Sequence, residues 1–420
     1  MHNISMFSCV FKFFSNIIYC RLLDWLNLNS ILPDTQFGFR QNKSTEQAAV
    51  ILIEEVKRRI ATYKSCYVCF VDYQKAFDTV DRTLLFQKLA NLGLSQHFTT
   101  LLYNIYKENL IQVSSDNCLS DPITQNLGVP QGDKLSPILF SIFIADLSKV
   151  LSDTQCFNVF YADDLAIVAH NINTLQAGLN SLEKYCASNK LTVNINKTKV
   201  MKFRFGGQFC PIYDVLHYNN ENLEFVPQFE YLGIVLSNKL APRAHLDKLL
   251  SKSKAAIGSL NKKLDMQRIS YTSAVRLLNS VVLPTATYGV NVFGILQSPM
   301  LENHLKQVTG IFFKRWLGLN KYTSTTRVLH HLFEDDVLNV RKCRGDLRRC
   351  YGAYYSNGLH HALCIDRTCY GRDRGDCECR YCRLPILDEN HLEQCLFFDL
   401  DTQLHSRIQR IFNDFVQRHN

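Results

Sequence analysis

The sequence has no low-complexity segment and no internal repeat in its 420 residues. These absences exclude fibrous, solenoid and largely disordered proteins. Hydrophobic residues make up 46% of the chain and charged residues 20%, as in ordinary globular proteins. The length is sufficient for two or three domains.

A long uninterrupted apolar run is also lacking near the start of the chain. Lys12, Asn16, Arg21 and Asp24 interrupt the apolar pairs of the first 26 residues, and no small-residue cleavage site follows. A signal peptide or a membrane anchor would need such a run. We therefore expect a packed amphipathic helix here and no membrane partner.

Cysteine is frequent, with 16 residues, but it is not spaced as in a small secreted disulfide scaffold. Cys66 and Cys69, for example, fall inside one apolar run. Such scatter indicates a reducing, intracellular compartment. The sequence also contains neither a Gly-x-x-x-x-Gly-Lys-Ser/Thr phosphate loop nor a Gly-x-Ser-x-Gly nucleophile turn, so no motif of those chemistries competes for the function.

The net charge of +9 is spread unevenly along the chain. Residues 239–349 contain 19 Lys and Arg against 7 Asp and Glu, a surplus of +12. A basic block of this kind favours a surface that binds a polyanion. A set of solvated helix faces is the alternative interpretation.

Apolar spacing divides the chain into four zones. Residues 1–65 are predicted to be helical, 66–240 to alternate strands and helices, 241–350 to be mostly helical, and 351–420 to form a separate region rich in Cys and His. Within these zones the patterns predict helices to about residue 29 and over 45–63, 136–151 and 175–188, and strands over 66–71, 158–161 and 165–169.

Three carboxylates carry the strongest chemical signal. Asp163 and Asp164 are adjacent in a turn between two apolar runs, and Asp72 ends another apolar run. Adjacent carboxylates repel one another, and a divalent cation removes that cost. If the strands are neighbours, the three side chains suit a pair of Mg²⁺ ions that assist phosphoryl transfer. An exposed acidic turn is the alternative.

With these residues in view, the chain resembles the reverse transcriptases of non-LTR (LINE-type) retrotransposons over roughly residues 4–240. Six motifs occur in the order of that family. They are Gln36-Phe37-Gly38-Phe39-Arg40 with Ser44-Thr45; the segment 72–78; Gly128-Val129-Pro130-Gln131-Gly132-Asp133 with Leu135-Ser136-Pro137; Tyr161-Ala162-Asp163-Asp164; Asn194-Ile195-Asn196-Lys197-Thr198-Lys199; and Tyr231-Leu232-Gly233.

The resemblance implies an α+β fold, a right-hand polymerase whose antiparallel palm sheet packs on helices. Residues 1–65 would be partial fingers, 66–240 the palm, 241–350 a basic helical thumb and 351–420 a small Cys/His module. The implied activity is RNA-directed DNA polymerisation by two-metal nucleotidyl transfer, with an RNA template, a DNA primer and dNTPs as partners. We expect it to act in the nucleus; the sequence does not indicate the oligomeric state.

The same resemblance implies roles for particular residues. Asp72, Asp163 and the more peripheral Asp164 would be Mg²⁺ ligands, and Lys197 would be a proton donor near the pyrophosphate. Phe77 would exclude a ribose 2′-hydroxyl. Gln131, Gly132 and Arg40 would lie on the nucleotide side. Tyr231, Leu232 and Gly233 would grip the primer end. Core packing of Phe77 and a surface position of Lys197 are the alternatives.

One departure from the family pattern lies at the start of the chain. The family has an Arg-Pro pair just before the position of Ile4-Ser5 and a Lys further upstream, where this chain reads Met1-His2-Asn3. We therefore expect a member truncated at its N-terminal end, without the family's endonuclease. Because basic groups there help to hold the triphosphate, such a chain would polymerise poorly.

A second constellation lies near the end of the chain. Cys379-x₂-Cys382-x₈-His391-x₃-Cys395 has a spacing close to that of a zinc knuckle, and many relatives carry a similar group. Packed reduced cysteines are the alternative to Zn²⁺. For the whole chain, two other functions remain open: a group II intron-type reverse transcriptase, and an inactive relic that only binds nucleic acid.

Overall fold

The computed structural model describes residues 5–107, 109–115, 118–204, 214–295, 298–326 and 328–329. The chain divides into two compact units. The first consists of Met1–Ser253 and Pro284–Phe293, and the second of Lys254–Leu283 and the residues from Gly294 onward. Each unit is described separately below.

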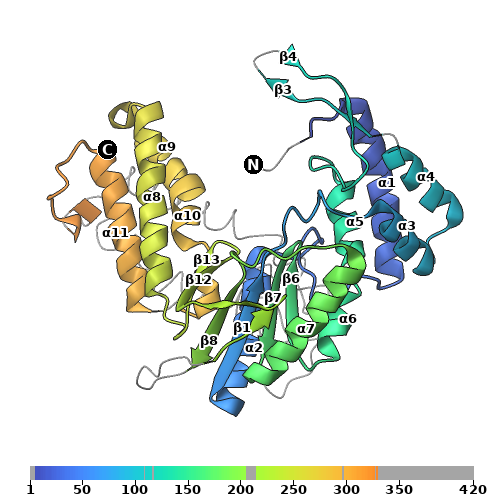
Figure 1. Cartoon of the computed structure of the whole chain (residues 1–420). Coiled ribbons are helices and arrows are strands. Elements are labelled where there is room, and N and C mark those ends of the chain that lie inside the picture. Colours follow the sequence, from blue (N-terminus) through green and yellow to red (C-terminus); the bar gives the residue numbers. More distant parts are fainter. Residues whose placement is uncertain are drawn as a thin grey trace, which may run out of the picture. The chain divides into compact units, whose positions relative to one another are not determined.

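A five-stranded sheet forms the centre of the first unit (Figure 1). Its order is β11-β8-β1-β7-β6, and every neighbouring pair is antiparallel except β11 and β8. The central strand β1 is apolar and buried after its first residue, Ser65, as expected for a strand whose two faces are both covered. The strands are β1 (Ser65–Val71), β6 (Phe157–Tyr161), β7 (Asp164–Ala169), β8 (Lys199–Arg204) and β11 (Glu224–Phe225).

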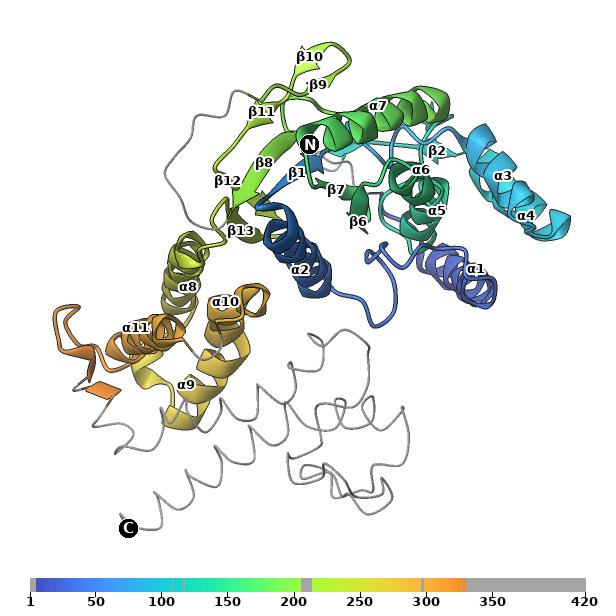
Figure 2. The ribbon, with the colours of Figure 1, turned by 90° about the horizontal axis from the view of Figure 1, so that it is seen from below.

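Alternate residues of the sheet face two different cores. Tyr67, Cys69 and Val71 join the larger core, whereas Val68 and Phe70 join the smaller one. The larger core is built with α1 (Cys9–Leu28), α3 (Arg82–Asn91), α4 (Gln96–Lys107), α5 (Leu135–Phe143), α6 (Leu147–Ser152) and α7 (Ile172–Asn189). The smaller core is built with α2 (Thr45–Tyr63) and the hairpin of β12 (Gln228–Tyr231) and β13 (Ile234–Ser237). Figure 2 shows α2 and α7 on opposite faces of the sheet.

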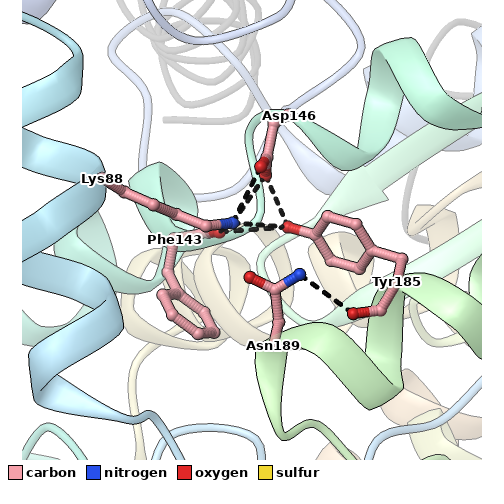
Figure 3. Close-up of polar contacts among 5 residues, drawn as sticks. All are labelled: Lys88, Phe143, Asp146, Tyr185 and Asn189. Carbon is pink, nitrogen blue, oxygen red and sulfur yellow. Dashed lines mark hydrogen bonds and ion pairs between the residues drawn. The ribbon is translucent and has the colours of Figure 1, made fainter.

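A polar cluster ties α3 to the helices behind the sheet (Figure 3). The ammonium of Lys88 donates to both carboxylate oxygens of Asp146 at 2.9 Å and to the carbonyl oxygen of Phe143 at 2.7 Å. The hydroxyl of Tyr185, on α7, donates to the same Asp146 carboxylate at 2.5 Å. The cluster therefore joins α3, the α5–α6 junction and α7, and it fixes the larger core that supports the sheet.

Several short hairpins lie outside the main sheet. β2 (Leu110–Ile111) pairs with β5 (Ile123–Thr124), and β3 (Ser114–Ser115) pairs with β4 (Cys118–Leu119). β9 (His217–Tyr218) pairs with β10 (Glu221–Asn222). The sequence patterns did not predict these pairs, because strands of two residues have no periodicity to recognise.

The described part of the second unit is helical. It contains the end of α8 (Arg243–Lys263), η1 (Met266–Arg268), α9 (Tyr271–Leu277), η2 (Leu278–Val282) and α11 (Pro299–Trp316). The indole N–H of Trp316 donates to the carbonyl oxygen of Ile269 at 3.1 Å, which fastens α11 to the turn before α9. The remaining elements, α10 (Leu283–Thr287) and η3 (Val290–Phe293), belong to the first unit from Pro284 onward. The predicted helical character of residues 241–350 is confirmed where the structure describes them.

The predicted α+β class is confirmed, and so are most of the predicted elements. One predicted helix, 136–151, is divided: α5 ends at Phe143 and α6 begins at Leu147. The break leaves Asp146 free to accept from Lys88 and Tyr185. The stretch Leu135–Ser152 is also the one candidate membrane span among the described residues, but most of it is buried within the larger core.

Candidate active site

The two adjacent carboxylates lie at the tip of the β6–β7 hairpin. Tyr161 pairs with Asp164, so Ala162 and Asp163 form a two-residue turn. Ala162 has a φ of 57°, whereas Asp163 is not among the residues with positive φ. This is the pattern of a type II′ turn, whose first central position usually holds glycine. An alanine there costs about 1–2 kcal/mol, so the surroundings must hold the turn in place.

The third predicted carboxylate, Asp72, lies at the same end of the neighbouring strand. Asp72 directly follows β1, and Val71 pairs with Leu165 of β7. Because the strands are antiparallel, the next step of this register sets Asp72 opposite Asp164. The strand pairing that the sequence argument required is therefore present.

The electrostatics of the turn show that the three carboxylates lie close together. Partial removal from water, followed by the charges of Asp163 and then Asp72, raises the pKa of Asp164 to about 6. The side chain nevertheless keeps contact with solvent. The two neighbouring charges contribute because like charges that lie close together disfavour ionisation.

The segment 194–199 is bound to the backbone on both sides of Asp72. The N–H of Asn194 donates to the carbonyl oxygen of Asp72 at 2.7 Å, and the N–H of Asp72 donates to the hydroxyl of Thr198 at 3.2 Å. Lys197 thereby comes within 3.7 Å of the Asp72 carboxylate, measured from Nζ to Oδ2. The side chain of Lys197 is 67% exposed, so its ammonium remains accessible to a ligand.

The donor set of this site fits Mg²⁺. Asp72, Asp163 and Asp164 offer oxygen atoms, and a divalent cation would offset their mutual repulsion. Mg²⁺ commonly binds one or two protein carboxylates and completes its shell with water and substrate phosphates. In the described part of the chain, no group of three or more His, Cys, Asp or Glu side chains is placed so that it could hold a metal ion.

Phe77 and the segment 128–132 form a second wall of the site. The N–H of Val129 donates to the carbonyl oxygen of Phe77 at 2.8 Å, and a Cβ on Gly128 would lie 2.5 Å from the carbonyl oxygen of Asp78. The ring of Phe77 lies 4.8 Å from that of Phe140, between ring centroids. Phe77 therefore packs on α5 and is only partly buried, and its effect on the sugar remains a prediction.

Gln131 and Gly132 lie beside the first described residue. The N–H of Ser5 donates to the carbonyl oxygen of Gln131 at 2.6 Å. Gly132 has a φ of 140°, and a Cβ there would lie 2.2 Å from the carbonyl oxygen of Ser5. Only glycine fits this position.

The buried Arg82 binds the backbone of the segment that leads into residues 128–132, a role that the sequence did not suggest. Its guanidinium donates to four backbone carbonyl oxygens and is 8% exposed. Burial lowers its pKa. Neither spacing nor charge pattern marks this arginine, because its partners lie more than 20 residues away in the sequence.

Arg40 is partly engaged by its own loop. Its Nη1 donates to the carbonyl oxygens of Pro33 at 2.8 Å and Gln36 at 3.3 Å. Nearby, burial and then the charge of Arg40 lower the pKa of Lys43, whose ammonium lies 4.6 Å from the centroid of the Phe37 ring. Contact of Arg40 with a nucleotide stays a prediction.

The turn at Leu232-Gly233 joins β12 to β13 near the carboxylates. Both residues have positive φ, 48° and 80°, as in a type I′ hairpin turn. Two donors hold it: the hydroxyl of Tyr288 reaches the carbonyl oxygen of Leu232, and the ammonium of Lys248 reaches that of Gly233, both at 2.9 Å. Burial and then the charge of Asp164 raise the pKa of Tyr231, which therefore lies near the acidic turn.

The predicted zinc ligands Cys379, Cys382, His391 and Cys395 lie outside the described residues.

Sequence comparison defines the class of protein to which this site belongs. Residues 1–236, more than half of the chain, match the family described as reverse transcriptase (RNA-dependent DNA polymerase). The chain therefore belongs to the reverse transcriptase family. This confirms the resemblance that its sequence motifs indicated.

Among curated proteins the chain is similar to polymerases of mobile elements. It is 26% identical over 296 residues to the RNA-directed DNA polymerase from mobile element jockey of Drosophila funebris, covering 68% of this chain and 32% of that protein. It is 29% identical over 304 residues to the probable RNA-directed DNA polymerase from transposon BS of Drosophila melanogaster, covering 70% and 33%. The chain thus spans about a third of the length of these relatives.

Among solved structures, telomerase from Candida albicans in complex with a TWJ fragment of telomeric RNA aligns with a TM-score of 0.44 and 12% identity. The alignment covers 77% of this chain and 58% of that one.

Proposed function

We propose that this chain carries the nucleotidyl-transfer centre of a mobile-element reverse transcriptase, which extends a DNA primer with dNTPs along an RNA template. The observation that carries the proposal is the convergence of Asp72, at the end of β1, with the Asp163-Asp164 turn of the adjacent hairpin. Family membership supports the same reaction. The assignment of residues 1–65 to the fingers, 66–240 to the palm and 241–350 to the thumb is part of this proposal.

Each group of the site has a part in the proposed reaction. Asp72 and Asp163 would hold Mg²⁺, with Asp164 more peripheral; bound Mg²⁺ supplies charge neutralisation and a more reactive primer hydroxyl. The primer 3′-hydroxyl loses its proton to solvent, and its oxygen forms a bond to the α-phosphorus as the bond to the pyrophosphate oxygen breaks. The 3.7 Å approach of Lys197 to Asp72 supports its role as the proton donor to that leaving group.

The substrate-facing walls have separate tasks. The partly buried Phe77 would lie beneath the sugar, and Gln131 with Gly132 would line the nucleotide and template side. The proximity of Tyr231 to Asp164 supports a primer end held by the 231–233 turn. A positioned hydroxyl and triphosphate, rather than covalent chemistry by the protein, account for most catalysis of phosphoryl transfer.

Primer extension on an RNA template with dNTPs and Mg²⁺ tests the proposal. Incorporation by the wild-type chain, even if slow, should fall by at least about 10²-fold in Asp163→Asn, by analogy with the loss of one preorganised hydrogen-bond donor at other active sites. Asp153→Asn is the matched control: the same chemical change at the exposed C-cap of α6 should leave the rate unchanged. Absence of incorporation by the wild type alongside duplex binding would favour a binding protein without activity. Equal rates in wild type and Asp163→Asn would also contradict the proposal.

A further inference from the structure

The tip of the β6–β7 hairpin is held by a segment that lies 126 residues earlier in the sequence. The N–H of Phe37 donates to the carbonyl oxygen of Phe160 at 2.8 Å, and the N–H of Phe160 donates to the carbonyl oxygen of Thr35 at 2.9 Å. Residue 36 thereby forms a parallel bridge with Phe160 at the outer edge of β6. This bridge brings the side chain of Gln36 to the turn.

The amide of Gln36 bonds both backbone groups of Ala162. Its Oε1 accepts from the N–H of Ala162 at 3.1 Å and from the N–H of Gly38 at 2.9 Å. Its Nε2 donates to the carbonyl oxygen of Ala162 at 3.4 Å. Gln36 is 1% exposed, so these bonds form away from solvent, where the loss of a partner is most costly.

Ala162 needs such support because of its conformation. Its φ of 57° is unfavourable for a residue with a side chain, and it persists only where the surroundings determine it. The supporting segment also fits the turn closely: a Cβ on Gly38 would lie 2.2 Å from the nitrogen of Ala162. Segment 35–38 therefore contacts the turn through the Gln36 amide and through a glycine that leaves room for it.

We infer that Gln36 is a positioning residue that fixes the backbone of Ala162 and, through it, the directions of the Asp163 and Asp164 carboxylates. It acts through the turn and touches neither nucleotide nor metal. The inference rests on the proposed function, because the carboxylate directions matter only if they hold a cation. A neutral amide suits this task, since it supplies a donor and an acceptor together without adding a fourth charge to an acidic site.

The first test compares Gln36→Met with Thr35→Val in the full chain. Gln36→Met keeps the length of the side chain but removes both polar groups. Thr35→Val is the matched control, because the Thr35 hydroxyl bonds Asn158 and Ser148 from the same segment without reaching the turn. We measure Mn²⁺ affinity by the loss of the free-ion EPR signal, and hydrogen exchange of the Ala162 amide.

Gln36→Met should weaken Mn²⁺ binding about 10–100-fold, as loss of a group that orients a metal ligand commonly does. Exchange of the Ala162 amide should accelerate, and kcat should fall while the KM for primer–template stays near the wild-type value. Thr35→Val should change neither the Mn²⁺ affinity nor this exchange rate, even if it lowers the melting temperature as much.

A double-mutant cycle with Ala162→Gly tests the route of the effect. Glycine adopts positive φ without strain, so the turn should then depend less on Gln36. Gln36→Met should weaken Mn²⁺ binding less in the Ala162→Gly background than in the wild type. Additive effects would show that Gln36 does not act through this backbone, and would overturn the inference.

The outcomes separate the inference from the proposed function. Mn²⁺ binding that is insensitive to Asp163→Asn overturns the proposed function and, with it, the consequence for the carboxylates. Mn²⁺ binding that depends on Asp163 but is equal in wild type, Gln36→Met and Thr35→Val overturns the inference alone. Unchanged exchange of the Ala162 amide in Gln36→Met overturns it as well. If Gln36→Met does not fold, Gln36→Glu takes its place, because glutamate keeps the acceptor. The Ala162 amide of Gln36→Glu should exchange faster than in the wild type, though to a smaller degree. Protection of this amide at the wild-type level in Gln36→Glu would count against the inference.

Discussion

Replacing Arg82 by Met should destabilise the first unit and loosen the wall that carries Gln131. The guanidinium donates to the carbonyl oxygens of Tyr106 at 2.6 Å, Gln125 at 2.7 Å, Gly128 at 2.8 Å and, more weakly, Leu127 at 3.4 Å. At about 1 kcal/mol of net stability for each of the three short bonds, the loss is about 3 kcal/mol. Relief of the buried charge offsets part of it, so we expect about 2–3 kcal/mol.

Urea unfolding followed by circular dichroism measures this change, and hydrogen exchange over residues 125–132 measures the loosening of the wall. Arg58→Met is the matched control, because the same substitution removes a side chain that is 63% exposed and paired with Glu55. That surface pair should contribute less than about 1 kcal/mol. Equal destabilisation by the two substitutions, or unchanged exchange in Arg82→Met, would refute the structural role given to Arg82.

Three further predictions follow from the site and the sequence. Asp81→Asn should lower stability by less than about 1 kcal/mol at neutral pH, because asparagine still caps α3 and only the ion pair with the largely exposed Lys190 is lost. The hydrogen bond with Lys190 lowers the pKa of Asp81, and a lowered folded pKa gives stability that is lost as pH falls through it. Melting curves of the two proteins should therefore converge below about pH 3.8. Phe77→Val should raise ribonucleotide incorporation relative to dNTP in single-nucleotide extension, and an unchanged ratio would leave Phe77 a packing residue only. Metal analysis should find about one zinc per chain, lost in Cys382→Ser, and a folded protein without zinc would decide for packed cysteines.

The elements that the sequence predicted correctly are those with a local cause. The strand β1 is a continuous apolar run, and α2 begins where Ser44 and Gln47 form a capping box. The Asp163-Asp164 turn was recognisable because charged residues interrupt two apolar strands. The pairing of Asp72 with that turn follows from the strand order, so convergence of the carboxylates was predictable once the strands were taken as neighbours.

The features that the sequence did not predict depend on contacts between distant segments. Gln36 was part of a recognised motif, but nothing local shows that its amide bonds Ala162. Tyr288 reaches Leu232 across 56 residues, and Arg82 reaches Gly128 across 46. Apolar periodicity reports which side of an element is buried, and it carries no information on such polar partners. The division between α5 and α6 was not predicted for the same reason, because Asp146 at this junction bonds residues of two other helices.

Single-turnover incorporation opposite a defined RNA base tests the central claim most directly. A primer annealed to an RNA template is offered one dNTP at a time with Mg²⁺. The account predicts extension with the complementary dNTP, little with the other three, and loss of extension in Asp163→Asn but not in Asp153→Asn. Incorporation that ignores the template base, or that survives Asp163→Asn, would contradict it.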